Sequence, residues 1–155
     1  MNILLIEDDE DKRKQISSLL SDIALESSLW EAKSLHSGLS HLISRHFDLI
    51  VADMSMPTFD IGIEEDGGRP QAYGGREILK QMNRRKIATP VLVVTQFDRF
   101  DDGADTLTLK QLDDQLATAY PAFYLGAVYY DSRSEDWKTQ LANLIKAVLP
   151  DLKDI

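Results

Sequence analysis

Short apolar runs alternate with amphipathic helical patterns along almost the whole chain. Each run is too short for a typical helix, and the residues that follow it place apolar side chains at helical spacing. The expected strands are residues 2–6, 28–32, 49–53, 91–95 and 123–130. Buried strands that alternate with helices are typical of a parallel sheet covered on both faces. The sequence therefore predicts an α/β fold built on a five-stranded parallel sheet.

Five helices are expected between and after these strands. Ser34 is in position to cap the second helix and Ser134 to open the last one. The expected helices are residues 11–24, 35–43, 75–86, 106–119 and a final helix that ends before Pro150. Residues 97–105 are predicted to form a polar loop. Residues 58–74 are predicted to form a long acidic, glycine-containing surface loop, because four acidic residues and four glycines make this segment too polar to bury.

The bulk properties exclude several classes of protein. The chain has 155 residues, of which 43% are hydrophobic and 28% charged, as expected for one globular domain in the cytoplasm. A net charge of −9 argues against direct binding to nucleic acid, which needs a basic face. Without cysteine the chain can form no disulfide, thiolate metal site or thiol nucleophile. No apolar stretch approaches the length of a membrane span.

Acidic residues stand where two of the predicted strands end. Glu7 and Asp8 directly follow the first strand, and Asp53 ends the third. Open α/β sheets bind ligands at the carboxyl ends of their strands, so these side chains are expected to share one crevice. Like charges in such a crevice repel one another and favour a bound cation. Oxygen ligands of this kind suit Mg²⁺, which predicts a magnesium and phosphate site centred on Asp53.

The order of these motifs resembles that of the receiver domain of two-component response regulators. A glycine-led helix that begins at Gly75 is also similar to the family. The other matching segments are Ile3–Asp9, Asp48–Pro57 and Pro90–Thr95. The resemblance implies a flavodoxin-like, doubly wound (βα)5 fold. It also implies that residues 1–155 form a single stand-alone receiver-like domain, with residues 58–74 as an insertion.

The resemblance also assigns roles to individual residues. Asp53 stands at the phosphoacceptor position, and Glu7 and Asp8 stand at the acidic pair that holds Mg²⁺, with Asp8 expected to be the direct ligand. Ser55 stands where the family offers a backbone carbonyl to the metal. Thr95 stands at the switch hydroxyl that follows the phosphoryl group. An acyl phosphate at Asp53 is chemically reasonable, because a carboxylate can attack phosphorus while a metal neutralises charge.

The family further implies protein partners. A sensor histidine kinase or a phosphotransfer protein is expected to donate the phosphoryl group. A downstream protein partner, or a second copy in a homodimer, is expected at the face formed by the fourth helix and fifth strand. Self-dephosphorylation is the only catalytic activity expected, so the chain is predicted to be a signalling domain rather than an enzyme.

One departure from the family puts phosphorylation in question. Receivers carry a lysine at the end of the fifth strand, where its ammonium pairs with the phosphoryl oxygens, and no lysine occurs in residues 129–134. Counting back from Ser134 places Asp131 at this position, which would oppose phosphorylation by repulsion. Counting forward from Gly126 places Arg133 there, which would keep a cation of different shape. The sequence leaves both alignments open.

Two other functions remain as alternatives. A pseudo-receiver would keep the fold and the acidic pocket, but the missing lysine and Gln96 would disable its switch and leave a phosphorylation-independent interaction or dimerisation module. A haloacid-dehalogenase-type phosphatase would turn over through an aspartyl phosphate. Such enzymes need a second aspartate two residues after the nucleophile, and Ser55 stands at that place here.

Overall fold

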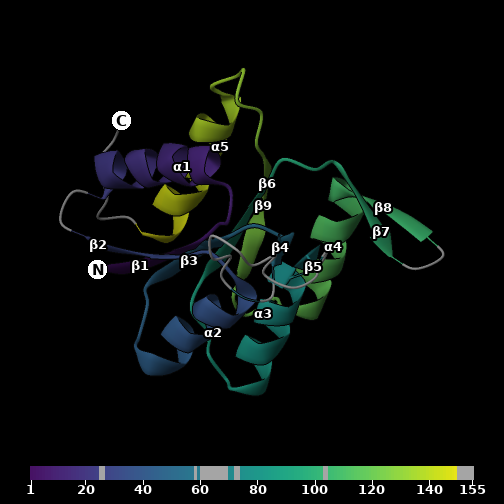
Figure 1. The fold of residues 1–155 in the computed structure, drawn as a ribbon, viewed down its shortest axis with the longest axis horizontal. Helices are drawn as coiled ribbons and strands as arrows, with labels where there is room; N and C mark the ends of the chain where they lie inside the picture. The colour runs from purple at the N-terminus through teal and green to yellow at the C-terminus, as the bar shows by residue number, and fades with distance from the viewer. Residues whose placement is uncertain (25–26, 58, 60–69, 72–73, 103–104, 150–155) are drawn as a thin grey trace.

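A five-stranded parallel sheet forms the centre of the molecule (Figure 1). The computed structural model describes residues 1–24, 27–57, 59, 70–71, 74–102 and 105–149. Within these residues the sheet has the order β2-β1-β3-β6-β9, and all its neighbouring strands are parallel. The strands are β1 (Asn2–Ile6), β2 (Ser28–Ala32), β3 (Leu49–Ala52), β6 (Val91–Thr95) and β9 (Tyr124–Tyr129). The predicted flavodoxin-like sheet is therefore confirmed.

Helices cover both faces of this sheet (Figure 1). One face carries α1 (Glu10–Ile23) and α5 (Asp136–Val148). The other face carries α2 (Leu35–Ser44), α3 (Gly74–Arg84) and α4 (Leu109–Ala119). Alternate residues of β1 enter the two cores: Ile3 and Leu5 pack towards α1 and α5, while Leu4 and Ile6 pack towards the other three helices. This alternation follows from the two-residue period of a strand.

Side-chain caps fix the starts of several helices. Ser34 accepts a hydrogen bond from the Ser37 N–H and forms a capping box, as the sequence predicted for α2. Thr108 and Gln111 form the same arrangement at the start of α4. The predicted opening of the last helix at Ser134 is wrong, because α5 begins at Asp136. Ser134 lies before the helix, and its hydroxyl accepts a hydrogen bond of 3.1 Å from the N–H of Asp136, the first residue of α5.

The segment predicted as a polar loop at residues 97–105 is largely an antiparallel ribbon. The segment contains β7 (Arg99–Asp102), which pairs with β8 (Asp105–Thr108) so that Phe100 lies opposite Leu107. Because β8 occupies residues up to Thr108, the helix predicted over 106–119 begins only at Leu109. Phe100 is 5% exposed and joins the core beside α4. These two strands are short and contain few apolar residues. Their sequence therefore shows no apolar pattern from which strands could be predicted.

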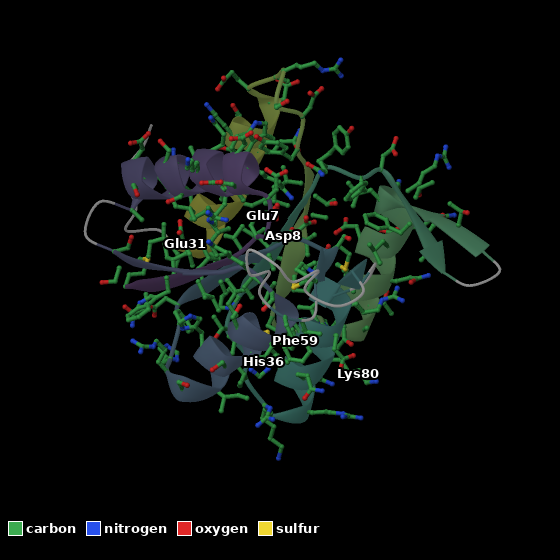
Figure 2. The ribbon with its side chains drawn as sticks, viewed as in Figure 1. Glu7, Asp8, Glu31, His36, Phe59 and Lys80 are labelled. Carbon is green, nitrogen blue, oxygen red and sulfur yellow. The ribbon has the colours of Figure 1, made fainter. Side chains whose placement is uncertain are left out.

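The predicted loop at residues 58–74 is corrected at its C-terminal end. Just before it, β4 (Met56–Pro57) pairs with β5 (Pro70–Gln71) in an antiparallel sheet, and Gly74 already belongs to α3. Phe59 lies beside His36 of α2, with their ring centroids 5.3 Å apart (Figure 2). Residues 58, 60–69 and 72–73 lie outside the described residues, so the predicted acidic loop remains a prediction there.

Among the helices of the described residues, none combines the length and the apolar character that crossing a membrane requires.

Candidate functional site

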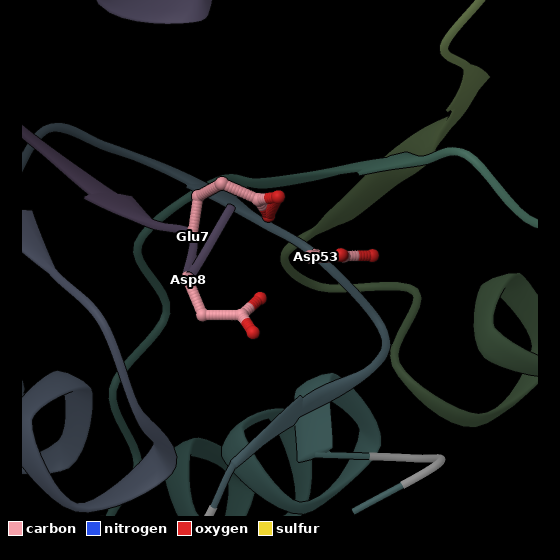
Figure 3. A group of neighbouring side chains, drawn as sticks. All are labelled: Glu7, Asp8 and Asp53. Carbon is pink, nitrogen blue, oxygen red and sulfur yellow. The ribbon is translucent and has the colours of Figure 1, made fainter. Parts of the chain in front are cut away.

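Three carboxylates predicted from the sequence meet at one edge of the sheet. Glu7 and Asp8 follow β1, and Asp53 follows the neighbouring strand β3, whose Ala52 is paired with Ile6. Each of the three residues offers one carboxylate oxygen, and these oxygens lie within 4.8 Å of one another (Figure 3). The strand order reverses between β1 and β3, which is where doubly wound sheets open a ligand crevice.

The backbone around Asp53 holds its carboxylate in a fixed position. The Asp53 N–H donates to the Ile6 carbonyl over 3.1 Å, which ties the end of β3 to the end of β1. The Asp53 Oδ1 accepts a hydrogen bond from the Met54 N–H over 2.6 Å. The side chain is only 4% exposed, so its charge needs a partner inside the pocket.

Lys12 of helix α1 provides that partner. Its Nζ lies 3.1 Å from Oδ2 of Asp53 and 3.1 Å from Oε1 of Glu7. The same ammonium donates to the Val94 carbonyl over 2.8 Å and to Oε2 of Glu7 over 3.3 Å. Lys12 is 1% exposed, which is exceptional for a lysine. Lys12 was not among the predicted site residues, because in sequence it is one of several charged residues at the start of an amphipathic helix.

The carboxylates retain capacity for a metal ion. The Oε1 atom of Glu7 is buried and has no hydrogen-bond partner among the described residues, although Lys12 lies at ion-pair distance from it. Burial raises the pKa of Glu7 to about 9. The nearby Lys12 ammonium acts to lower this pKa, and the charge of Asp53 acts to raise it further. The pKa of Asp8 is also raised, first by desolvation and then by Asp53. A buried oxygen without a hydrogen bond, in a set of oxygen donors, fits a hard divalent cation.

The two remaining predicted site residues flank this pocket. Thr95 ends β6, the strand next to β3, and is fully buried. Its hydroxyl accepts a hydrogen bond from the Phe97 N–H over 3.2 Å. Ser55 lies two residues after Asp53, and its N–H is 3.5 Å from Oδ1 of Asp53. These positions are compatible with the roles expected of both residues.

Neither Asp131 nor Arg133 supplies the pocket cation. Their side chains pair with each other, with Arg133 Nε 3.1 Å from Asp131 Oδ1, and the Arg133 side chain is 88% exposed. Tyr130 directly follows the last strand, and its N–H donates to the Thr95 carbonyl over 2.7 Å. Its ring centroid lies 5.8 Å from Lys12 Nζ. The cation that Arg133 was expected to supply therefore comes from another element of the fold, and which residue stands at the family's lysine position remains open.

Comparison with known proteins identifies the family. A family model described as the response regulator receiver domain matches residues 3–116. The chain belongs to the response regulator receiver family. An uncharacterized protein, y4jR, of Sinorhizobium fredii is 31% identical over 145 residues, which cover 92% of this chain and 95% of the relative. The Detocs response regulatory protein DtcB of Enterobacter cloacae is 29% identical over 147 residues, which cover 94% of this chain and 98% of the relative.

A solved structure of the family shares the fold. The phosphorylated cyanobacterial phytochrome response regulator RcpA is similar to this receiver with a TM-score of 0.66, over 99% of this chain and 98% of that chain. At 15% sequence identity this similarity concerns the fold alone. Receiver domains are signalling domains of two-component systems that interact with histidine kinases or phosphotransfer proteins and bind Mg²⁺ at an acidic pocket.

Proposed function

We propose that this receiver is a stand-alone response regulator that accepts a phosphoryl group on Asp53 with the help of Mg²⁺. The observation that carries the proposal is the convergence of Glu7, Asp8 and Asp53 at one edge of a receiver sheet, with oxygens within 4.8 Å. The relative DtcB, which is named a response regulatory protein and matches over almost its full length, supports a regulatory role for this chain as well.

The metal would be held by the three carboxylates and by the backbone carbonyl of Ser55. When all three carboxylates are ionised, the one ammonium of Lys12 leaves a net charge of −2 in the pocket. A divalent cation neutralises this charge and, when bound, offsets the negative charge that develops on the transferred phosphoryl oxygens. Asp8 is the most accessible of the three carboxylates and offers the ion a route of entry.

The chemical step is a phosphoryl transfer to the Asp53 carboxylate. An Asp53 oxygen attacks the phosphorus of a phosphohistidine on the donor protein, and a new O–P bond forms as the P–N bond breaks. The bonding electrons return to the imidazole nitrogen, so histidine is the leaving group. Because Asp53 is anchored by the Ile6 carbonyl and the Met54 N–H, its carboxylate is positioned before the donor arrives.

Thr95 would pass the change to the surface. If the Thr95 side chain rotates so that its hydroxyl donates to the new phosphoryl group, its oxygen moves relative to the Phe97 N–H from which it now accepts a hydrogen bond. Phe97 is 44% exposed, and Tyr129, the partner of Thr95 across β6 and β9, is 46% exposed. Two exposed aromatic residues next to the switch hydroxyl fit an output surface, with α4 and β9, for a downstream protein or a second copy.

The pseudo-receiver alternative loses part of its support. That alternative rested on the missing lysine and on Gln96, and the first ground weakens because Lys12 Nζ lies 3.1 Å from Asp53 Oδ2. An opposite charge at this distance acts strongly on a carboxylate. The structure also offers no reason to prefer the phosphatase alternative, because Ser55 cannot act as the carboxylic acid that such enzymes require.

Incubation with acetyl phosphate and Mg²⁺ tests the proposal directly. Intact-mass measurement should show one added phosphate per chain, and the same incubation with a chelator in place of Mg²⁺ should show none. The added phosphate should be released at alkaline pH and by hydroxylamine, as expected for an acyl phosphate. A chain that gains no phosphate from acetyl phosphate or from a phosphorylated histidine phosphotransfer protein would refute the phosphoacceptor role and favour the pseudo-receiver.

We expect the affinity for Mg²⁺ to depend strongly on pH. The ion binds the deprotonated carboxylates, and the raised pKa of Glu7 means that a proton competes with the ion throughout the neutral range. Below that pKa, one competing proton weakens binding by about tenfold for each unit of falling pH. Titration of Mg²⁺ by calorimetry or NMR between about pH 6 and pH 8 measures the effect.

The variant Glu7→Gln is the control for this pH dependence. It cannot carry the competing proton, so its weaker Mg²⁺ binding should vary much less with pH than that of the wild type. Equal pH dependence in the two proteins would show that the proton lies on another group.

A further inference from the structure

We propose that Lys12 supplies, from helix α1, the phosphate-pairing cation that other receivers carry at the end of the last strand of the sheet. This inference rests on the proposed phosphorylation of Asp53 and adds to it a residue that the family pattern does not contain. The ammonium lies 3.1 Å from Asp53 Oδ2, where a phosphoryl group would be added, and no described residue after β9 provides an ion pair to Asp53.

The ammonium group of Lys12 is bound by polar acceptors on several elements of the fold. Its ammonium has three N–H donors and reaches three acceptor groups, namely the carboxylates of Glu7 and Asp53 and the carbonyl of Val94. Lys14, two residues later on the same helix, is 69% exposed and pairs with Glu10 at the surface. The sequence places both lysines in one helix, but only Lys12 points into the acidic pocket.

The position of Lys12 is unfavourable without its acidic partners. It lies in the first turn of α1, where Asp9 caps the helix and the helix dipole disfavours a positive charge. Burial to 1% exposure also removes the ammonium from water, which is costly unless it is paired. An apolar side chain would fill the same space without either cost. The buried charge is therefore explained by what it pairs with.

Tyr130, which directly follows β9, is an aromatic residue and not a cation. Tyr130 is 7% exposed, and its ring packs against Trp137 with the centroids 4.8 Å apart. Lys12 Nζ lies 5.8 Å from the centroid of the Tyr130 ring. Tyr130 thus provides an aromatic neighbour for the ammonium, while the charge itself comes from the helix on the same face of the sheet.

Phosphorylation would change the partners of the ammonium. Once an Asp53 oxygen is bonded to phosphorus, the carboxylate loses its charge and the phosphoryl oxygens become the strongest acceptors nearby. Lys12 can move one N–H from Asp53 to a phosphoryl oxygen while it keeps its bond to Val94. Since Val94 directly precedes Thr95 in β6, the lysine connects the acceptor to the strand that carries the switch hydroxyl.

The variant Lys12→Met tests this assignment by two measurements that should move in opposite directions. The rate of phosphate incorporation from acetyl phosphate and Mg²⁺ should fall by about 10- to 100-fold, the range expected for loss of a charge-assisted hydrogen bond. The affinity for Mg²⁺ alone should rise, because a positive charge beside the metal ligands has been removed. A variant that has merely lost structure would weaken in both measurements.

The matched control is Lys14→Met, which removes an exposed lysine from the same helix and should change neither measurement. If circular dichroism shows that Lys12→Met is unfolded, Lys12→Gln is used in its place, because glutamine keeps a hydrogen-bond donor for the Val94 carbonyl without the charge. The same opposite changes in phosphorylation rate and Mg²⁺ affinity are then expected. A folded Lys12 variant with wild-type phosphorylation overturns the role of Lys12 and leaves the proposed function intact. A wild-type chain that takes up no phosphate overturns both.

Discussion

Replacement of Asp53 by asparagine should reduce phosphate incorporation to the background of the assay while the protein remains folded. The amide has the shape of the carboxylate but is not a nucleophile towards phosphorus. Its oxygen can still accept the hydrogen bond from the Met54 N–H. Lys12 keeps its contacts with Glu7 and with the Val94 carbonyl, so the buried ammonium is not left without partners. Intact mass and circular dichroism measure the two parts of this expectation.

The control for Asp53→Asn is Asp131→Asn. Asp131 follows the last strand and pairs with Arg133 at the surface, away from the ion pairs of the pocket. The Asp131 variant should take up phosphate at the wild-type rate. Phosphate that still adds to Asp53→Asn at that rate would place the acceptor elsewhere, and the arrangement of the three carboxylates would lose its proposed meaning.

Replacement of Gly75 by alanine should lower the free energy of unfolding by about 1–3 kcal/mol, the usual cost of extra volume in a packed site. A Cβ atom at Gly75 would lie 2.5 Å from the Asp53 carbonyl oxygen and 3.0 Å from the Met54 Cα. Both are backbone atoms, and the Gly75 N–H also donates to the Met54 carbonyl over 2.9 Å. The start of α3 must therefore move away from the strand end that carries the acceptor, so phosphorylation should slow as well. Urea unfolding measures the loss of stability.

The matched substitution for this prediction is Gly38→Ala in helix α2. The nearest atom to its added Cβ is the Ile6 Cδ1 methyl at 2.8 Å, and the end of a side chain can turn away. Alanine also favours the helix over glycine, so the net change should stay within about 1 kcal/mol. Equal losses at Gly38 and Gly75 would show that the backbone contact at Asp53 has no special effect.

Local patterns in the sequence were sufficient to predict the sheet and the convergence of its acidic residues. Five apolar runs followed by helical patterns indicate parallel strands, because each strand must return through a helix to the same edge. Glu7, Asp8 and Asp53 follow such runs directly, so their meeting could be predicted once β1 and β3 were taken as neighbours. The cap at Ser34 was predicted for a similarly local reason.

Other features depend on contacts that no local pattern reports. The β7–β8 ribbon is anchored by Phe100, whose burial depends on the packing beside α4. Whether a cation lies near Asp53 was left open, because counting along the last strand offered both Asp131 and Arg133 and could consider only residues close to that strand in sequence. The cation came from a helix more than a hundred residues earlier in the chain.

The sequence by itself determined the succession of the five strands of the main sheet and the five helices, and the three carboxylates at the strand ends, because these depend on periodicity and on the parallel direction of the strands. Only the tertiary structure decided which charge faces Asp53. Lys12 and Lys14 are alike in sequence, and the packing of α1 against the sheet turns one towards Glu7 and the Val94 carbonyl and the other towards water. The direction of a side chain on a helix depends on which face of that helix is buried, and that is a property of the whole fold.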